Sequence, residues 1–159
     1  MSQKVKIEKV NKVNFDDFVQ LIEKLAKYER QSPPDSRAKS RLKQDTLGEH
    51  PKIDAYLGKI NGKIATYVIL FMTYSSYLAL PILYIEDIFV LEEWRQKGIG
   101  LQMFQFCTQL AKKRGCGRIE WCVYNWNQPA IKFYKKINAT KLNKTYYRLN
   151  KKQVEHFSD

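Results

Sequence analysis

The sequence predicts a mixed α/β fold, in which a mostly antiparallel sheet is flanked by helices and a central parallel pair of strands forms a ligand cleft. Two apolar runs meet at Asn61-Gly62, a dipeptide typical of a type I′ hairpin turn. Apolar residues recur at helical spacing in residues 15–29 and 99–114. Around residues 84–124, a strand, a glycine-bearing turn, a helix and a strand follow one another, as in a parallel crossover unit. The length of 159 residues predicts a single domain, residues 1–159.

The first third of the chain predicts one strand and two helices. Residues 4–10 alternate apolar and charged side chains, as a half-buried strand does. The helix of residues 15–29 follows Asn14 and Asp17, a pair that resembles a capping box. A proline pair then breaks the chain, and a mostly polar second helix is expected from Asp35 to about Gly48.

The middle of the chain holds 22 residues without a charge, residues 64–85, which is long enough to cross a membrane. Polar residues lie at its centre, and β-branched and aromatic residues dominate its flanks. Two buried strands joined by a polar bend therefore fit better than a membrane span. We expect strands at residues 53–60 and 63–72, and another at residues 82–91.

The last third predicts a helix at residues 99–114, a strand at residues 119–124 and a second helix that starts at Asn127. Pro129 lies in the first turn of that helix, where proline is well tolerated. A final strand is expected at residues 145–149, followed by a short basic tail.

The chain is strongly basic, with 28 Lys and Arg against 16 Asp and Glu, a net charge of +12 and a pI near 9.6. Such a charge attracts anions, including nucleic acids, acidic membranes and polyphosphate cofactors, without specifying one of them. The three cysteines, Cys107, Cys116 and Cys122, lack metal-ligand spacing, so no metal site is expected and the thiols are interpreted as mostly buried fillers. The charged N-terminal sequence does not resemble a signal peptide, and we expect a cytoplasmic protein that is not inserted in a membrane.

The turn at residues 95–100, Arg-Gln-Lys-Gly-Ile-Gly, is a candidate anion site. Its glycines allow close backbone approach, and the first amides of the following helix have no partner within the helix. The pattern is neither the dinucleotide fingerprint nor a P-loop. A plain strand-to-helix turn would give the same spacing, so the spacing alone leaves both interpretations open.

Three further side chains could carry chemistry. Glu86 and Asp87 are adjacent in an otherwise apolar strand, where a carboxylate is costly unless it is paired or lines a wet cleft. They are either functional or paired with lysines at an exposed strand start. Tyr134 shares a helix face with apolar residues, which a core tyrosine would also do. Cys122 has no nearby histidine in the sequence, so a nucleophilic role is not favoured.

The chain resembles the GNAT superfamily of N-acetyltransferases. The turn at residues 95–100 fits that family's R/Q-x-x-G-x-G/A pyrophosphate loop and follows a strand. Four further segments resemble the spermidine/spermine (diamine) acetyltransferase branch: KLAKYER at residues 24–30, GEHP at 48–51, YIEDIFV at 84–90 and NWNQPAIKFYKK at 125–136. The resemblance therefore covers nearly the whole chain.

The resemblance implies an acetyl-CoA-dependent N-acetyltransferase that acts on a primary amine of a diamine, polyamine or lysine-like small molecule by direct attack in a ternary complex. Tyr134 would protonate the departing thiolate, and Glu86 would take the proton of the attacking amine as a general base acting through water. Asp87, Tyr28 and Glu29, together with Glu86, would hold the cationic substrate. The implied acetyl-CoA residues are Ile88, Phe89, Val90, Arg95, Gln96, Lys97, Gly98, Ile99, Gly100, Leu101, Asn127, Gln128, Pro129, Ala130 and Tyr134.

Several alternatives stay open at this stage. A protein or peptide amine, lysine or N-terminal, is the second substrate class, and a module that senses acetyl-CoA without turnover is the non-enzymatic alternative. Nucleic acid is not expected as a partner, because the C-terminal lysines lack an interleaved recognition motif. Relatives that handle polyamines carry acidic residues and a tryptophan before the final Arg-Leu, where this chain has residues 144–147, Lys-Thr-Tyr-Tyr. The family also implies a homodimer.

Overall fold

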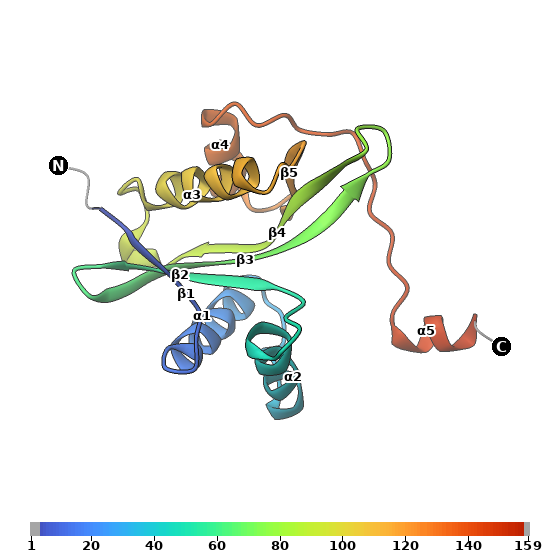
Figure 1. Ribbon diagram of the computed structural model, residues 1–159, viewed down its shortest axis with the longest axis horizontal. Helices are drawn as coiled ribbons and strands as arrows, with labels where there is room; N and C mark the ends of the chain where they lie inside the picture. Colours follow the sequence, from blue (N-terminus) through green and yellow to red (C-terminus); the bar gives the residue numbers. More distant parts are fainter. Residues whose placement is uncertain (1–3, 158–159) are drawn as a thin grey trace. The chain divides into compact units, whose positions relative to one another are not determined.

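The computed structural model describes residues 4–157, which form two compact units that divide after Cys122. The first unit contains a five-stranded sheet in the order β1-β2-β3-β4-β5 (Figure 1). The first four strands pair antiparallel, and β5 pairs parallel with β4. The strands are β1 (Lys6–Lys9), β2 (Asp54–Ile60), β3 (Lys63–Ser75), β4 (Leu80–Val90) and β5 (Arg118–Trp121). The predicted mixed fold with one parallel pair is confirmed.

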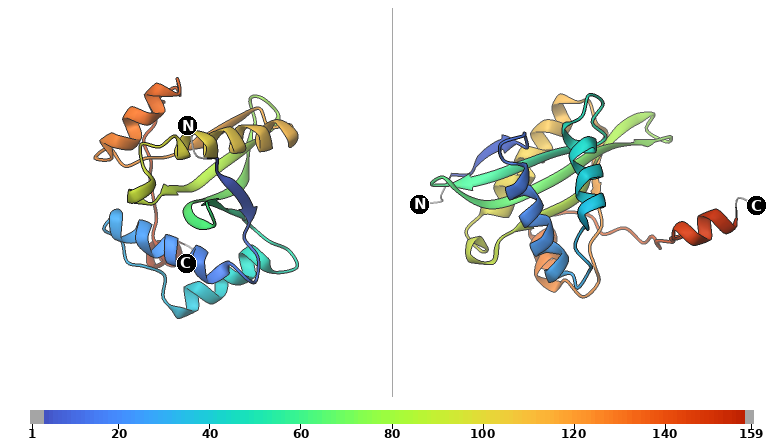
Figure 2. Two further views of the ribbon diagram at one scale, coloured as in Figure 1. Left: turned by 90° about the vertical axis from the view of Figure 1, so that its left-hand side faces the viewer. Right: turned by 90° about the horizontal axis from the view of Figure 1, so that it is seen from below.

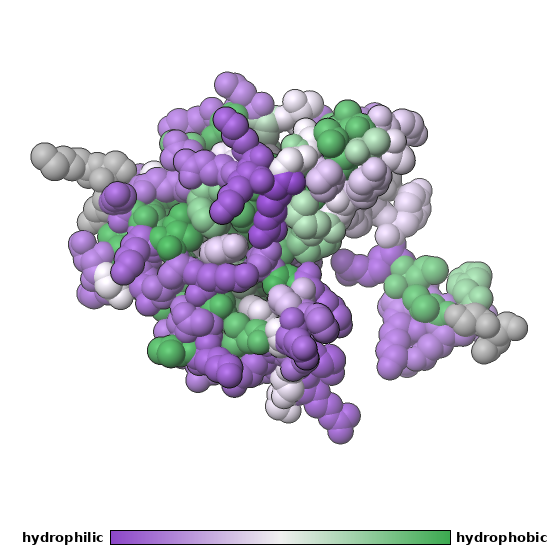
Figure 3. All heavy atoms as spheres, viewed as in Figure 1, coloured by the Kyte–Doolittle hydropathy of each residue, from purple (hydrophilic) through white to green (hydrophobic). Residues whose placement is uncertain are grey.

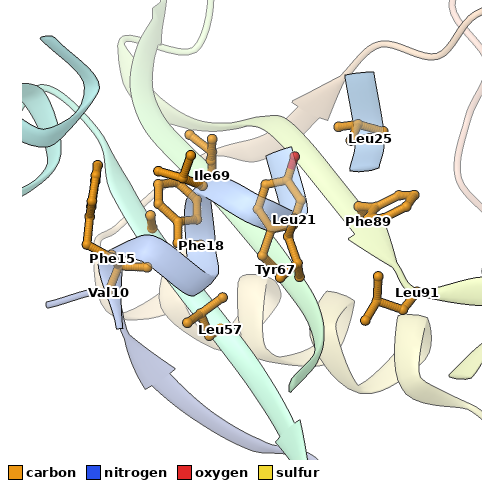
Figure 4. Packing of buried hydrophobic residues seen from close by; sticks show 12 residues of the cluster. Val10, Phe15, Phe18, Leu21, Leu25, Leu57, Tyr67, Ile69, Phe89 and Leu91 are labelled. Carbon is orange, nitrogen blue, oxygen red and sulfur yellow. The ribbon is translucent and has the colours of Figure 1, made fainter. Parts of the chain in front are cut away.

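Helices cover both faces of this sheet. Helices α1 (Phe15–Tyr28) and α2 (Ser36–Leu47) lie on one face, and α3 (Ile99–Lys113) lies on the other (Figures 1 and 2). Alternate strand residues point to alternate faces, so β3 sends Tyr67 towards α1 and Val68 towards α3, and both are fully buried. The α1 side chains and the sheet residues beneath them form one apolar cluster (Figure 4).

The β2–β3 hairpin turn has the predicted geometry. Asn61 has a φ of 50° and Gly62 a φ of 78°, and a type I′ turn needs this left-handed conformation at both positions. The prediction of a hairpin at this dipeptide is confirmed.

The uncharged middle of the chain forms the long strands β3 and β4, as the composition predicted, and they are longer than expected. Among residues 4–157, no helix is long and apolar enough to cross a membrane. The tip of this hairpin, residues 76–79 with the adjoining strand ends, exposes apolar side chains, and Figure 3 shows hydrophobic residues gathered there. The exposed residues are Met72, Tyr74, Tyr77, Leu78 and Leu80.

The capping predictions had mixed outcomes. Asp35 caps α2 by accepting a hydrogen bond from the Ala38 amide at 2.7 Å. Asn14 makes no capping bond to α1, so the predicted capping box is wrong. Its Oδ1 accepts from the Asn11 amide at 2.7 Å and its Nδ2 donates to Glu8 at 3.1 Å, which ties the turn before α1 to β1. A short polar side chain can satisfy such a turn instead of a helix end.

The second unit contains α4 (Gln128–Lys136) and α5 (Lys151–His156). Residues 139–150 between them form no regular structure, so the predicted strand at residues 145–149 is wrong, and a helix stands where a basic tail was expected. The β-propensity of Thr145, Tyr146 and Tyr147 does not make a strand without a neighbouring strand to pair with. A capping box between Asn150 and Gln153 begins α5.

The cysteines differ in exposure. Cys107 is buried in α3, Cys116 is half-buried, and Cys122 is exposed after β5, where its Sγ accepts a hydrogen bond from the Tyr84 hydroxyl at 3.2 Å. The interpretation of the thiols as mostly buried fillers therefore holds for Cys107 and is wrong for Cys122. The strand β5 ends at Trp121, so Cys122 lies just outside the sheet and is not covered by it.

Candidate active site

A β-bulge in β4 positions the two adjacent carboxylates. Asp87 pairs with Ile69 of β3, whereas Ile85 pairs with the next residue, Leu70, so Glu86 is an extra residue without a partner in the ladder. Because Ile69 and Leu70 point to opposite faces of the sheet, Asp87 and Ile85 do so too. Asp87 therefore lies on the α1 face and is half-buried, while Glu86 at the bulge is exposed.

The carboxylate of Asp87 has one protein partner. The Tyr67 hydroxyl donates to its Oδ2 at 3.0 Å, and within residues 4–157 no donor or cation pairs with Oδ1. Burial raises the pKa of Asp87 to about 6; the Tyr67 hydrogen bond opposes this rise, and the charges of Glu86 and Glu29 add to it. Sequence reasoning missed Tyr67. The available signal was a phenol in an apolar strand, since a buried hydroxyl needs a partner.

The end of α1 lies beside this part of β4. The Tyr28 ring is 6.1 Å from the Phe89 ring, and Glu29 is the C-cap residue of α1. Burial raises the pKa of Glu29. The Arg95 guanidinium lies 4.8 Å from the Tyr28 ring centre and 5.5 Å from that of Phe89, and its Nε donates to the Val90 carbonyl at 3.0 Å.

The structure thus brings together several residues that the sequence assigned to the site from distant segments. The set comprises Tyr28, Glu29, Glu86, Asp87, Phe89, Val90 and Arg95. Their individual roles stay predictions.

One edge of β4 is open for a ligand that pairs like a strand. The ladder between β4 and β5 ends at Ile85 and Trp121, and β4 continues to Val90. The Leu91 amide donates to Ala65 of β3 at 2.9 Å, so the backbone groups of Ile88 and Val90 point away from β3. The Phe89 carbonyl instead accepts from Thr66 Oγ1 at 2.7 Å. Of the three residues predicted to bind through their backbone, Ile88 and Val90 therefore present their N–H and C=O groups on the open edge, and Phe89 does not.

The glycine-bearing loop has the conformation of an anion cradle. Gln96 and Gly98 are left-handed, with φ values of 58° and 78°. Gly98 begins α3 without a side-chain cap, so the first amides of the helix remain available to an anion. The Lys97 Nζ donates to the Glu93 carbonyl at 2.7 Å and lies 5.1 Å from the Trp94 ring. The residues present fit the pyrophosphate of coenzyme A, with the open edge of β4 fitting an amide-bearing arm. Trp94 was not among the predicted site residues.

Ile99, Gly100 and Leu101 form the first turn of α3, and the other predicted residues, 127–130 and Tyr134, lie in the second unit. Asn127 caps α4, its Oδ1 accepting from the Ala130 amide at 3.4 Å, and Pro129 lies in the first turn. The Gln128 side chain donates to the Asn125 carbonyl at 2.8 Å. Tyr134 is half-buried on α4, with its ring 5.7 Å from that of Phe133.

A groove elsewhere contains none of the predicted site residues. It has a volume of about 610 Å³ and lies between α1, the β2–β3 turn and the segment after β4. Its charged lining residues are Asp17, Lys24, Lys59, Lys63 and Glu93. The groove therefore does not coincide with the carboxylates or with the glycine-bearing loop.

Comparison with known proteins identifies the family of this chain. The model of the acetyltransferase (GNAT) family matches residues 17–139. The L-ornithine N5-acetyltransferase NATA1 of Arabidopsis thaliana is 40% identical over 99 residues, 61% of this chain and 43% of that protein, so the match spans less than half of the plant enzyme. The thialysine N-epsilon-acetyltransferase of Mus musculus is 25% identical over 145 residues, 86% of this chain and 85% of the mouse enzyme.

Solved structures share the fold. An integron cassette protein from the mobile metagenome of V. cholerae has a TM-score of 0.81 and 26% identity, covering 99% of this chain and 98% of its own. The aminoglycoside N-acetyltransferase AAC(6')-Iy, solved in complex with CoA, has a TM-score of 0.74 over 95% of this chain and 97% of its own, and at 14% identity it supports the fold alone.

Proposed function

Because the chain belongs to the acetyltransferase (GNAT) family, we propose that it transfers the acetyl group of acetyl-CoA to a primary amine of a small cationic molecule. Diamines, polyamines and lysine-like amino acids are the substrate class. The chain is an N-acetyltransferase, and the proposal concerns its substrate, its mechanism and the residues that carry them. We also propose that both compact units belong to one catalytic domain, residues 1–159.

The observation that carries the substrate proposal is the acidic corner, which we define as Glu29, Glu86 and Asp87. In a chain of net charge +12, none of these carboxylates forms an ion pair with a described residue. Glu29 and Asp87 are half-buried, and half-buried carboxylates without a counter-charge favour a cationic ligand. The two enzymes named above are described as acetylating ornithine and thialysine, which supports an amine on a short, flexible side chain.

Acetyl-CoA is the acetyl donor, and when bound it supplies the acetyl group as a reactive thioester. The backbone of Ile88 and Val90 would hold its pantetheine arm along the open edge of β4. The loop of residues 95–101 would hold its pyrophosphate on the first amides of α3. Residues 127–130 at the start of α4 would complete the binding site.

Two side chains would move protons. An alkylamine is almost wholly protonated at neutral pH and attacks only as the neutral amine, so a proton acceptor is needed. Glu86, exposed at the bulge, is suited to take that proton through water. Tyr134 would donate a proton to the sulfur of the leaving group. Direct transfer needs no covalent bond to the enzyme, so Cys122 has no part in this mechanism.

The experiment that tests this proposal is mass-spectrometric detection of products. The protein is incubated with acetyl-CoA and equal amounts of spermidine, 1,3-diaminopropane, ornithine, thialysine and a lysine peptide. Acetylated small amines as the dominant products would support the proposal. Product from the peptide alone would move the substrate to protein amines, and no product despite acetyl-CoA binding would favour a sensor module.

We also propose that the protein is a homodimer. The family expectation supports this, as do the exposed apolar side chains at the tip of the β3–β4 hairpin and at Leu149 and Phe157. Light scattering coupled to size-exclusion chromatography should give twice the chain mass of 18.8 kDa, and the mass of a monomer at micromolar concentration would contradict the proposal. A cytoplasmic location also stays a prediction.

A further inference from the structure

We propose that Tyr67 is a positioning residue for the amine substrate: its hydroxyl fixes the carboxylate of Asp87 so that the second carboxylate oxygen, Oδ1, binds the cationic group of that substrate. The inference rests on the proposed function, because it assumes that a cationic amine binds at the acidic corner. It adds a residue on β3 to a site that the sequence had assigned to α1 and β4.

The surroundings of Tyr67 hold its ring in one place. Tyr67 is fully buried in β3, opposite Phe89 in the register with β4. Its ring centre lies 5.7 Å from that of Phe18 and 6.3 Å from that of Phe89 (Figure 4). With the ring packed between two aromatic neighbours, the hydroxyl has little freedom, and it meets Asp87 Oδ2 at 3.0 Å.

Packing alone does not require the hydroxyl. A phenylalanine would fill the same space against Phe18 and Phe89, and a buried hydroxyl costs free energy unless it is hydrogen-bonded. Here the acceptor is a carboxylate two residues before Phe89, beside the bulge that exposes Glu86. The hydrogen bond is charge-assisted, which makes it stronger than one between neutral groups.

The second carboxylate oxygen of Asp87, Oδ1, is available to a ligand. Lysines neutralise carboxylates elsewhere in this unit, as in the pairs Lys59–Glu8 and Lys9–Asp54 at the β1 end of the sheet. No described lysine or arginine does so for Asp87. With Oδ2 held by Tyr67, Asp87 offers Oδ1 to an ammonium group and cannot turn both oxygens to it.

The same bond affects the charge of Asp87. Several titratable groups surround it: Glu86 on β4, Glu29 and Tyr28 at the end of α1, Tyr67 on β3, and Arg95 stacked on Tyr28. Burial and the two glutamates raise the pKa of Asp87, and the Tyr67 hydrogen bond lowers it. With a pKa of about 6, Asp87 is roughly nine-tenths ionised at pH 7. Removing the hydroxyl would raise this pKa further and reduce the anionic fraction.

The test is steady-state kinetics of Tyr67→Phe with the amine that the wild type acetylates best. Hydrogen bonds to charged groups are worth a factor of roughly 10 to 100, so we expect the KM for the amine to rise by about that factor, with the KM for acetyl-CoA changed less than about twofold. The acidic limb of the pH profile of kcat/KM should move to higher pH, because the anionic form of Asp87 binds the amine.

Two further variants separate positioning from stability. In Asp87→Asn, adding Tyr67→Phe should cause no further loss, since Tyr67 acts through Asp87. Tyr56→Phe is the matched control: Tyr56 lies on β2 with its ring packed on Phe106, 4.8 Å away, and it should behave like wild type. A ¹³C NMR titration of the aspartate carboxyls should show a raised pKa for Asp87 in Tyr67→Phe.

The outcomes discriminate between the two proposals. If the wild type acetylates a cationic amine and Tyr67→Phe keeps its KM and pH profile, the inference about Tyr67 is overturned and the proposed function stands. A further loss of the same size in the Asp87→Asn background would also overturn it. If the wild type neither binds nor acetylates any amine, the proposed function fails and the inference with it.

Discussion

Gly58→Ala should destabilise the sheet that carries the acidic corner. Gly58 lies in β2 at the register shift beside Lys59, and a β-carbon there would clash with Thr66 Cγ2 and would lie 2.7 Å from Val5 Cγ1 and 3.3 Å from Met103 Sδ. The first two neighbours are branched side chains that cannot swing away without changing rotamer. Thr66 also holds the Phe89 carbonyl through its hydroxyl, so a shift of Thr66 reaches β4.

The size of the effect follows from two opposing terms. Overpacking a filled core costs about 1–3 kcal/mol, and replacing glycine by alanine returns about 0.4–1 kcal/mol by restricting the unfolded chain. The net expectation is a loss of about 1–2 kcal/mol, or a fall in Tm of roughly 2–8 °C for a chain of this size. Urea unfolding at pH 7 measures it, with an unchanged m-value as the sign that the denatured state is unaltered.

The substitution Thr66→Ser tests whether the clash with Thr66 causes the loss of stability. Thr66→Ser removes the clashing methyl group and keeps the hydroxyl that bonds Phe89, so it should recover part of the loss in Gly58→Ala while slightly destabilising the wild type. The double-mutant cycle should therefore show a favourable coupling of about 0.5 kcal/mol or more. Strict additivity of the two substitutions, or a Gly58→Ala protein as stable as wild type, would show that the core accommodates the β-carbon and that the clash does not limit stability.

Three other predictions concern single side chains. Tyr134→Phe should lower kcat by roughly 10²-fold to 10⁴-fold with the KM for acetyl-CoA kept, and an unchanged kcat would remove Tyr134 from the acid role. Asp54→Asn should destabilise the protein by about 1–3 kcal/mol at pH 7, because Asp54 pairs with Lys9 at 2.8 Å and Arg114 at 2.7 Å. The pKa of Asp54 is lowered in the fold, so this stabilisation is present above its unfolded value near 4 and is lost as the pH falls through the folded value; urea unfolding should show the difference shrinking between pH 5 and pH 3. Asp87→Asn should instead stabilise the protein at high pH. The folded pKa of Asp87 is raised to about 6 from an unfolded value near 4, so its ionisation destabilises the fold progressively between these two values and fully above pH 6. The variant should therefore unfold at a higher urea concentration than wild type at pH 8, and this difference should shrink as the pH falls from 6 towards 4. Equal midpoints at pH 8 would contradict the raised pKa.

Local signals in the sequence predicted the elements that depend on local chemistry. Asn61-Gly62 gave the hairpin, and Asn127 gave the cap of α4, since both depend on residues within a few positions. The turn before α3 has the left-handed glycine that its sequence suggested at Gly98. Asn14 is the exception, because its side chain had a competing partner in Glu8.

Features that depend on register or on partners could not be predicted. The bulge at Glu86 arises from how β4 pairs with β3, and the meeting of Tyr67 with Asp87 follows from that pairing. Alternation within one strand predicts that neighbours face opposite ways but does not show where a strand inserts an extra residue. The stacking of Arg95 on Tyr28 joins segments more than sixty positions apart. Residues 145–149 have a strand-like composition but form no strand, because a strand also needs a neighbouring strand to pair with.

The acidic corner also implies that the two substrates should respond to salt in opposite ways. Acetyl-CoA is an anion and the proposed amine substrate is a cation, and both would approach a protein of net charge +12. At low ionic strength the field of the whole chain accelerates the encounter with the anion and slows the encounter with the cation. Salt screens interactions beyond about 10 Å at 0.1 M, whereas direct contact with Asp87 and Glu29 is screened much less. Raising the salt concentration from 10 to 150 mM should therefore lower kcat/KM for acetyl-CoA and raise it for the amine, so that a modest ionic strength brings the two association rates closer together.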